Sequence, residues 1–337
     1  MASAYVELLP AQRARAQQLL AHFDLIDPQR LTLREEIAYY GCPFCDLDEG
    51  RLSDTLFGRA AEFCRYKECA RCGLHYAYPR LSAEGLRAWS VGAVQRDMST
   101  VSLRLGRVER APVRANRLLS ALMPTDYDLI CRSVRGGERV LDMGAGYGHV
   151  SHRLKQQGCD VTAVEHNLAR VRYLREECGI AVIDQSIEQA EFPSGAFDVV
   201  IFSRVLIHLF SVRRALEQAS TALKPGGRLI VSVTSSEAVS AASLRRPHWG
   251  NIGLDGFSLP TMFTAPSLRY VLRESGFDVT RLFHARDPLV HELFANAPAH
   301  WGWAARTLFT GAACALELLT VLKRQTSYLV GTAVKRG

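Results

Sequence analysis

The stretch RVLDMGAGYGHV, at residues 139–150, constrains the fold more than any other part of this chain. It starts with apolar residues, as a buried strand does, and then has glycine at every second position, as Gly144, Gly146 and Gly148. Glycine lets a backbone turn sharply and lie close to a ligand, because it carries no Cβ atom. The stretch therefore predicts a strand, a glycine-rich turn and the first turn of a helix, an arrangement typical of ligand sites in open α/β sheets.

Two acidic residues lie at the ends of successive predicted strands. Asp142 stands at the mouth of the glycine turn, and Glu165 closes the next apolar run, residues 160–165. A carboxylate at the tip of a second parallel strand can accept hydrogen bonds from ribose hydroxyls. An acid before the first glycine would repel a pyrophosphate, the usual ligand of a Gly-x-Gly-x-x-Gly fingerprint, but it could receive a cationic amino group. The pattern therefore predicts a site for a nucleoside-bearing cofactor that has an amino-acid end.

Four motifs, in order along the chain, closely resemble those of the class I S-adenosylmethionine-dependent methyltransferases. They are the glycine turn itself, FPSGAFDVV at residues 192–200, SRVLIHL at 203–209 and LKPGGRLIVSV at 223–233. The last three resemble the lead into the family's fourth strand, the segment after that strand, and the fifth strand with its preceding turn. The resemblance implies an α/β fold with a Rossmann-like, doubly wound sheet in which one of the last two strands is antiparallel to the rest.

Carried onto this sequence, the resemblance assigns residues to S-adenosylmethionine. Asp142 would anchor the methionine end, and Glu165 would take the ribose hydroxyls. Ser186 and Ile187 would contact adenine, although many members have an aspartate where Ser186 stands, which leaves this contact to a hydroxyl or a backbone N–H group. The full set of expected cofactor residues is Asp142, Gly144, Ala145, Gly146, Gly148, Glu165, His166, Ser186, Ile187 and Ser203.

Two Cys-x-x-Cys pairs lie upstream of the predicted α/β domain. The pairs are Cys42 with Cys45 and Cys69 with Cys72. Each pair can direct two thiolates at one ion, and two pairs complete a tetrahedral shell, which is the pattern of a zinc ribbon. Four protein ligands leave no open position, so the predicted Zn²⁺ site is structural. A redox role is the poorer alternative, because no thioredoxin-like pattern surrounds either pair.

The ribbon and the segments after the fifth strand have a resemblance of their own. CARCGLHYAYPRLSAE at residues 69–84 resembles the ribbon that precedes the methyltransferase domain in many bacterial enzymes. PHWG at 247–250 and FTAPSLRYVLRESGF at 263–277 resemble the same group. Those enzymes often belong to biosynthesis pathways for sugars, cell-surface glycans or natural products, so the resemblance implies an acceptor of that kind.

The sequence pattern divides the chain into four parts. We expect N-terminal helices over residues 1–38, the zinc ribbon over 39–80, a helical connector over 81–135 and the methyltransferase domain over 136–337. Four further expectations fall within the methyltransferase domain: a loop or lid beside the site over 234–264, a helix over 266–275 that Gly276 ends, an apolar C-terminal helix over 298–323, and the last two strands over 277–283 and 328–334.

Composition is that of an ordinary globular protein, with 22% charged residues, which argues against disorder. The net charge of +7 is compatible with nucleic acid, an anionic membrane or phosphorylated substrates, and selects none of them. Arg306 and Glu317 interrupt the apolar C-terminal helix, so we expect no transmembrane span, although contact with a membrane surface stays open. Paired cysteines without a signal peptide favour a cytoplasmic location.

Candidates for the chemistry come from the segments beside the predicted site. His208 follows the fourth strand, where substrates meet the methyl group in this fold, and is the first candidate for a general base; His248, in the expected lid, is the second. A helix-capping or buried structural role is the alternative for His208, and a surface position for His248. Further candidates for the acceptor pocket are Arg204, Trp249 and His291.

Three functions remain open from the sequence. The first is a methyltransferase that acts on a small-molecule, sugar or natural-product acceptor. The second is an RNA methyltransferase that targets ribosomal RNA and uses the ribbon to dock it. The third is a non-catalytic binding module, against which the intact Asp142 and glycine turn argue. The sequence leaves the methylated atom and the oligomeric state undetermined.

Overall fold

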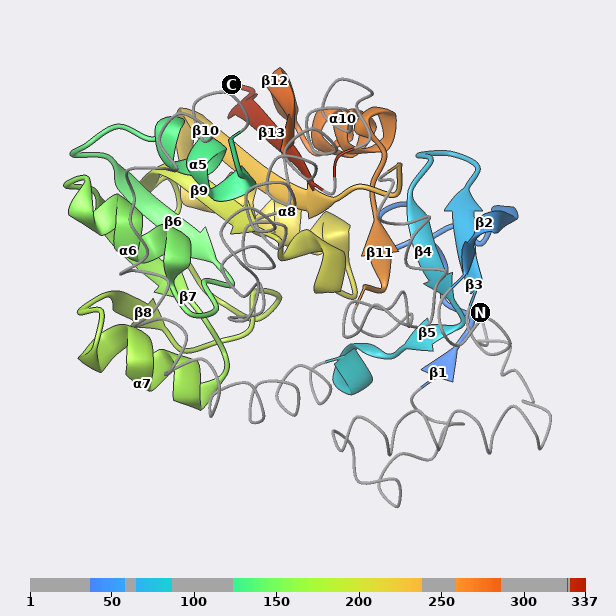
Figure 1. Ribbon diagram of the computed structural model, residues 1–337, viewed down its shortest axis with the longest axis horizontal. Helices are drawn as coiled ribbons and strands as arrows, with labels where there is room; N and C mark the ends of the chain where they lie inside the picture. Colours follow the sequence, from blue (N-terminus) through green and yellow to red (C-terminus); the bar gives the residue numbers. More distant parts are fainter. Residues whose placement is uncertain (1–36, 58–64, 87–123, 238–258, 286–325, 327) are drawn as a thin grey trace, which may run out of the picture.

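The chain was analysed as a computed structural model, which describes residues 37–57, 65–86, 124–237, 259–285, 326 and 328–337. These residues form a seven-stranded sheet with helices on both faces, and beside it a smaller four-stranded sheet (Figure 1). The expected N-terminal helices, most of the connector and lid, and the C-terminal apolar helix lie outside the described residues, as do His248, Trp249 and His291. No helix in the described ranges is long and apolar enough to cross a membrane.

The large sheet has the strand order β12-β13-β10-β9-β6-β7-β8. Its strands are β6 (Arg139–Met143), β7 (Asp160–Val164), β8 (Ala181–Ile183), β9 (Phe197–Ser203), β10 (Leu223–Thr234), β12 (Phe277–Ala285) and β13 (Tyr328–Lys335). β13 runs antiparallel to both neighbours, β10 and β12, whereas β6, β7, β8, β9 and β10 pair in parallel. The predicted Rossmann-like, doubly wound sheet with an antiparallel last strand is therefore confirmed.

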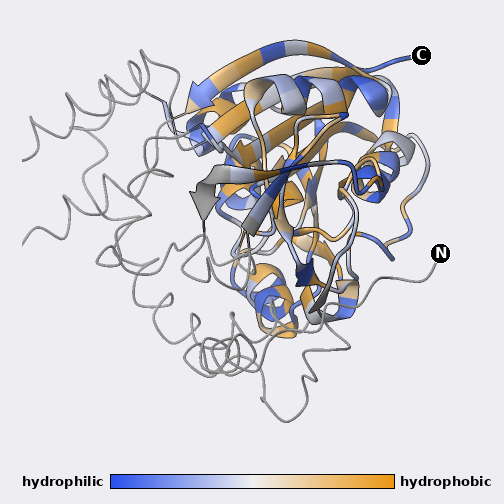
Figure 2. Ribbon diagram, turned by 90° about the vertical axis from the view of Figure 1, so that its right-hand side faces the viewer, coloured by the Kyte–Doolittle hydropathy of each residue, from blue (hydrophilic) through white to orange (hydrophobic). Residues whose placement is uncertain are grey.

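Alternation along the strands gives this sheet two apolar faces. Val140 of β6 packs in one buried cluster, and its neighbour Leu141 packs in the other. The first cluster takes in α5 (Asp126–Arg132), α6 (His149–Gln156) and α7 (Leu168–Glu176); the second takes in α8 (Val212–Ala222) and α10 (Ala265–Glu274). Figure 2 shows hydrophobic residues concentrated on the interior strands, while the helices mix hydrophobic and hydrophilic residues along their length. Each face of the sheet is thus covered by helices, as a parallel sheet requires.

The predicted helix over residues 266–275 is α10, and its ends follow from local chemistry. The Thr264 hydroxyl accepts a hydrogen bond from the Ser267 N–H, and the Ser267 hydroxyl accepts one from the Thr264 N–H, so the two residues form a capping box. Gly276, with φ of 85°, follows the C-cap in the left-handed conformation that glycine adopts most easily.

The small sheet contains the ribbon and one strand from elsewhere in the chain. Its order is β11-β4-β3-β2, with β2 (Gly50–Phe57), β3 (Arg65–Cys69), β4 (His75–Tyr78) and β11 (Thr261–Met262). β1 (Ile37–Ala38) and β5 (Arg80–Leu81) pair beside it. β11 lies within the expected lid, yet both of its residues are buried. Residues 261–262 of that region thus pair with β4 in the ribbon sheet.

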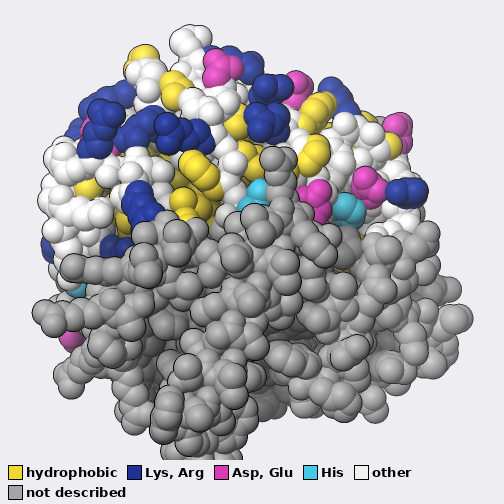
Figure 3. All heavy atoms as spheres, turned by 45° about the horizontal axis from the view of Figure 1, so that its top comes forward, with side chains coloured by type: hydrophobic (Ala, Val, Ile, Leu, Met, Phe, Trp, Pro, Cys, Tyr) yellow, Lys and Arg dark blue, Asp and Glu magenta, His cyan; other side chains and the backbone are white. Residues whose placement is uncertain are grey.

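Charged side chains of both signs occupy the face that carries the C-terminal strand. Figure 3 shows many Lys and Arg side chains there, with Asp and Glu among them. Arg336, for example, pairs with Asp278 at 2.9 Å. Mixed charges on exposed strands are an ordinary solvated surface, so this face does not identify a partner.

Candidate cofactor site and cysteine cluster

The glycine turn lies between β6 and α6 and is fixed by the neighbouring strand. Gly144, Gly146 and Gly148 have φ of 75°, 59° and 74°, a region that side chains with a Cβ atom rarely adopt. The backbone N–H groups of Gly144 and Ala145 donate to the Val164 carbonyl oxygen at 2.8 and 3.0 Å. The turn is thereby held across the carboxyl ends of β6 and β7.

Each of these glycines has different surroundings. A Cβ atom on Gly144 would lie 2.8 Å from a Val205 methyl carbon, and one on Gly148 would lie 2.4 Å from Leu174 Cδ2. No heavy atom of the described residues lies within 4 Å of a Cβ atom built on Gly146. The first and third glycines therefore allow close packing, whereas the second leaves its backbone open to a ligand.

Asp142 is almost completely buried, with 1% exposure, at the end of the central strand β6. The Ser151 hydroxyl donates to its Oδ2 atom at 2.6 Å, while Oδ1 has no hydrogen-bond partner among the described residues. Burial, with the nearby negative charge of Glu165, raises the pKa of Asp142 to about 6, against the opposing hydrogen bond from Ser151. A cation placed beside Oδ1 would satisfy the unpartnered oxygen and favour the ionised carboxylate.

Glu165 is buried at the end of β7 and accepts three backbone hydrogen bonds. His166 and Asn167 donate to Oε1 at 3.0 and 2.9 Å, and Gly146 donates to Oε2 at 3.0 Å. The Arg170 guanidinium lies 3.7 Å from Oε2. Glu165 thus ties the glycine turn to the start of α7, and a carboxylate with about four acceptor positions can still take a further donor.

These elements surround one cavity with a volume of about 430 Å³. Every expected cofactor residue lines it except Gly148, which packs behind it against Leu174. The lining cofactor residues are Asp142, Gly144, Ala145, Gly146, Glu165, His166, Ser186, Ile187 and Ser203. Residues from the ends of β6, β7 and β9 thus meet in one space, at the edge where ligands bind in open α/β sheets.

At the expected adenine contact, the Ser186 hydroxyl already has a partner. Its Oγ donates to Gln189 Oε1 at 3.1 Å, and its carbonyl oxygen accepts from the N–H groups of Gln189 and Ala190. Ser186 and Ile187 are both buried at the cavity wall. Because the hydroxyl serves the local turn, a backbone N–H group is the better candidate for an adenine contact here.

The cavity is also lined by His208, the last residue of the short 3-10 helix η1 (Leu206–His208). Its side chain is exposed, unlike the buried Leu206 and Ile207 before it, so the buried structural alternative does not apply. Leu209 and Phe210 continue this wall. His208 therefore lies where a group bound in the cavity can reach it.

Sequence reasoning missed several residues that line the cavity. Tyr127 and His149 come from α5 and α6, and Ala83 and Leu86 come from the segment after β5. No motif marks them, since each comes from a different part of the chain. Their only sequence signal is proximity to predicted site elements, as for His149 directly after the glycine turn.

Arg204, a candidate for the acceptor pocket, lines the cavity but is bound to α5. Its Nε and Nη2 atoms each donate to a carboxylate oxygen of the fully buried Asp126 at 2.7 Å. The guanidinium lies 4.6 Å from the Tyr127 ring and 3.9 Å from the Tyr328 ring. Despite the opposing effect of burial, the carboxylate holds the pKa of Arg204 above its usual value. The side chain thus joins α5 to the sheet through an ion pair whose carboxylate is fully buried.

The four cysteines of the ribbon come together as one cluster. Their Sγ atoms all lie within 4.8 Å of one another, and those of Cys42 and Cys72 are 3.6 Å apart. Zinc bound to four sulfurs at ~2.3 Å would set the sulfurs roughly 3.8 Å apart, so the cluster has the size of a tetrahedral zinc site.

The pKa values of the cysteine thiols also indicate that the cluster would be stabilised by a bound cation. A hydrogen bond from the Cys72 thiol, helped by backbone N–H groups, lowers the pKa of Cys42 to about 6. Burial, together with the Cys42 charge, raises the pKa of Cys45 to about 12. One thiolate thus forms readily, and its negative charge then disfavours ionisation of the neighbouring thiols. A divalent cation would compensate the repulsion between the thiolates.

Comparison with known proteins decides the family. Residues 108–282 match the model of the methyltransferase domain. The chain belongs to the methyltransferase domain family. Its strand order, with the glycine turn after β6, is that of a class I S-adenosylmethionine-dependent methyltransferase.

Named relatives of this chain share part of its length. A sarcosine/dimethylglycine N-methyltransferase of Halorhodospira halochloris is 32% identical over 178 residues, which is 50% of this chain and 59% of that protein. A ubiquinone biosynthesis O-methyltransferase of Xylella fastidiosa (strain M23) is 36% identical over 122 residues, 34% of this chain and 49% of that protein. The chain thus spans about half the length of these two relatives.

Among solved structures, a 1,6-didemethyltoxoflavin-N1-methyltransferase from Burkholderia thailandensis is 21% identical, with a TM-score of 0.45. The match covers 80% of this chain and 97% of that one.

Proposed function

We propose that this chain is an S-adenosylmethionine-dependent methyltransferase that methylates a small-molecule acceptor. The observation that carries the proposal is the single cavity that joins buried Asp142, Glu165 and the open backbone of Gly146 to the wall with His208. The first three groups fit a cofactor that is cationic at one end and carries ribose hydroxyls at the other. The fourth group, His208, lines the same cavity.

The residues present fit S-adenosylmethionine in two respects. The unpartnered Oδ1 atom of Asp142 fits the amino group of the methionine end, and Glu165 fits the ribose hydroxyls. When bound, S-adenosylmethionine supplies a methyl group on a positively charged sulfur. That methyl group passes to a nucleophile aligned with the sulfur–methyl bond, which breaks as the new bond forms. The chain itself has to hold both partners in that alignment and keep water out.

His208 is the proposed general base. An attacking hydroxyl or amine loses a proton as its bond to the methyl carbon forms, and an imidazole can take that proton near neutral pH. The side chain is exposed and lines the cavity from the segment that follows β9. His248, the second candidate, remains a proposal that rests on the sequence alone.

A small-molecule acceptor is favoured by the names of the relatives. One relative is named an N-methyltransferase and the other an O-methyltransferase, so the names support a small-molecule class while leaving the acceptor atom open. They do not favour the RNA or the non-catalytic alternative. A volume of about 430 Å³ falls within the range of roughly 300–1,000 Å³ that small-molecule sites occupy, which fits the cofactor itself. A sugar or natural-product intermediate remains our proposal within this class.

The four ribbon cysteines, Cys42, Cys45, Cys69 and Cys72, are the proposed ligands of a structural zinc ion. Their mutual distances support the assignment, as do the lowered pKa of Cys42 and the raised pKa of Cys45. With four protein ligands the ion would have no open position, so its role would be to stabilise the ribbon.

Calorimetric titration of the zinc-loaded full-length protein with S-adenosylmethionine tests the proposal. We expect micromolar binding that weakens by about tenfold or more in Asp142→Ala and in Glu165→Ala, because each loses a charged hydrogen-bonding partner. Asp198→Asn is the matched control, since Asp198 bonds the Arg139 N–H group at the far end of β6 from Asp142. Absence of binding to folded wild-type protein would refute the proposed function.

A further inference from the structure

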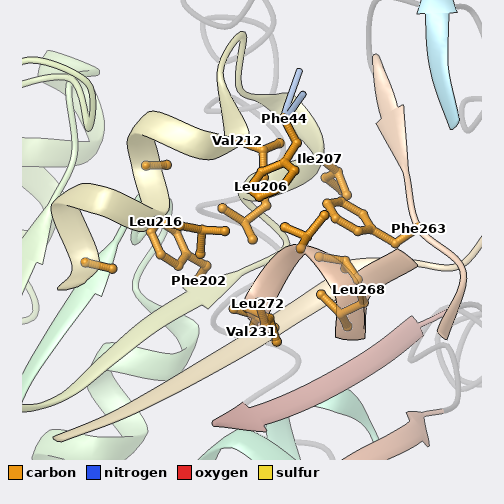
Figure 4. Packing of buried hydrophobic residues seen from close by; sticks show 14 of the residues in the cluster. Phe44, Phe202, Leu206, Ile207, Val212, Leu216, Val231, Phe263, Leu268 and Leu272 are labelled. Atoms are coloured by element: carbon orange, nitrogen blue, oxygen red, sulfur yellow. The ribbon is translucent and has the colours of Figure 1, made fainter. Parts of the chain in front are cut away.

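The first cysteine knuckle, residues 42–45, packs directly on the elements that carry the cavity wall. The Val212 N–H group, at the start of α8, donates to the Pro43 carbonyl oxygen at 3.0 Å. The Arg213 Nε atom donates to the Phe44 carbonyl oxygen at 2.8 Å, and its guanidinium lies 4.4 Å from the Phe44 ring. Figure 4 shows Phe44 within an apolar cluster that includes Leu206, Ile207 and Val212.

Arg80 makes a second connection between the same two regions, closer to the cavity. Its Nη1 atom donates to the Phe210 carbonyl oxygen at 2.8 Å, and its Nη2 atom donates to the Gly41 carbonyl oxygen at 3.1 Å. The guanidinium also lies 4.3 Å from the Phe210 ring and 5.6 Å from the Tyr40 ring. One side chain thus holds the residue before Cys42 and a residue of the cavity wall.

The charge of Arg80 is unusual because the side chain is buried, with only 3% of the residue exposed. None of the described carboxylates forms an ion pair with it, and its hydrogen bonds go to backbone carbonyl oxygens. Burial lowers the pKa of Arg80 to about 10, and negative charge at Cys42, followed by Tyr76, Tyr40 and Asp46, opposes that change. A buried cation needs a counter-charge, and four thiolates around one Zn²⁺ ion carry a net charge of about −2.

We propose that Arg80 is a positioning residue, which supplies the counter-charge of the zinc–tetrathiolate cluster and clamps the backbone of Phe210 in the cavity wall. The proposal rests on the proposed zinc site and on the proposed acceptor side of the cavity. It makes the ribbon a support for the wall that contains His208 and Phe210. Zinc in the ribbon would then affect acceptor binding more than cofactor binding, because the cofactor residues lie at the ends of β6 and β7.

Two substitutions separate the charge from the clamp. Arg80→Lys keeps a cation near the cluster, but a single ammonium group cannot span the two carbonyl oxygens as the planar guanidinium does. Arg80→Met keeps an apolar stem and loses both functions. Arg71→Met is the matched control, because Arg71 stands inside the second knuckle between Cys69 and Cys72, yet is exposed to solvent. Solvent screens an exposed cation, so its loss should alter zinc binding little.

The experiment measures zinc release and backbone protection in the full-length proteins. Zinc transfer to a chromophoric chelator should be about 10- to 100-fold faster from Arg80→Met than from wild type, because removing a group that supports metal ligands weakens metal affinity by about that factor. Transfer from Arg80→Lys and from Arg71→Met should stay near the wild-type rate. Hydrogen exchange at the His208 and Val212 amides should accelerate by about tenfold in both Arg80 variants, because the Phe210 clamp is lost in each.

Each contrary result overturns a stated part of the proposal. A wild-type rate of zinc release from Arg80→Met overturns the counter-charge role of Arg80, as does rapid zinc release from Arg80→Lys. Wild-type exchange at His208 and Val212 in Arg80→Lys overturns the clamp, even where Arg80→Met does not fold. Wild-type protein that purifies without zinc refutes the metal site and the counter-charge together. Failure of the proposed methyltransferase function is seen separately, as wild-type protein that holds zinc but does not bind S-adenosylmethionine.

Discussion

Replacing Gly146 by alanine should separate backbone strain from cofactor binding. Gly146 and Gly276 both have positive φ, 59° and 85°, and no described heavy atom lies within 4 Å of a Cβ atom built on either. The left-handed conformation costs about 1–2 kcal/mol for a residue that has a Cβ atom. Both substitutions should therefore reduce the free energy of unfolding by about the same 1–2 kcal/mol.

The two variants should differ in cofactor affinity. The alanine methyl group at position 146 would enter the cavity beside Glu165, whereas position 276 lies at the end of α10, away from the cavity. We expect S-adenosylmethionine binding to weaken by about tenfold or more in Gly146→Ala and to be unchanged in Gly276→Ala. Gly144→Ala adds a contact of 2.8 Å with Val205, so it should lose a further ~1–3 kcal/mol of stability.

Urea denaturation gives the free energies of unfolding, and calorimetry gives the affinities. Equal destabilisation of Gly146→Ala and Gly276→Ala, with equal affinity for S-adenosylmethionine, would refute the reasoning. That result would mean that the cofactor does not approach the backbone at Gly146. A loss of affinity in Gly276→Ala would instead show that strain alone, without any intrusion into the cavity, weakens binding.

Further predictions concern ion pairs, pH and metal. Arg204→Ala leaves the fully buried Asp126 carboxylate unpaired, so the free energy of unfolding, measured in urea, should fall by about 3–5 kcal/mol. The pKa of Asp142 is raised from 3.8 to about 6, so the cofactor-free protein should lose up to about 3 kcal/mol of stability as pH rises from 3.8 to about 6. The affinity for S-adenosylmethionine should conversely fall as pH drops below about 6, since an amino group binds the ionised carboxylate; calorimetry from pH 5 to 8 should show no such fall in Asp142→Asn. Removing zinc with a chelator should lower the thermal midpoint by about 2–4 °C for each kcal/mol lost, and a midpoint unchanged after complete removal would contradict the structural role.

The parts of the fold that could be predicted are those whose signals are local in sequence. The strand, turn and helix around Gly144 follow from a single stretch of twelve residues. The start and end of α10 follow from Thr264 and Gly276, which act within one helical turn of their positions. The direction of β13 needed the family resemblance, because its pairing with β10 joins residues about 100 positions apart.

The ribbon shows why the remainder could not be predicted. Its cysteine pairs are local signals, and they do meet as one cluster. The fourth strand of its sheet is β11, whose Thr261 pairs with Tyr76 across 185 positions and has no motif. The clamp by Arg80 on Phe210 spans 130 positions. Contacts between residues so far apart in the sequence depend on how the two sheets are arranged in the folded chain. Two short segments carry too few residues to predict that arrangement.

The same distinction separates the two halves of the candidate site. The cofactor half consists of loops at the carboxyl ends of adjacent parallel strands, where each loop is a short motif and the sheet brings the motifs together. The half that we propose for the acceptor combines Leu86 from the ribbon side, Tyr127 from α5 and Phe210 after η1, which no single motif contains. Substitutions in the ribbon can therefore reshape the acceptor wall without changing the glycine turn or its carboxylates.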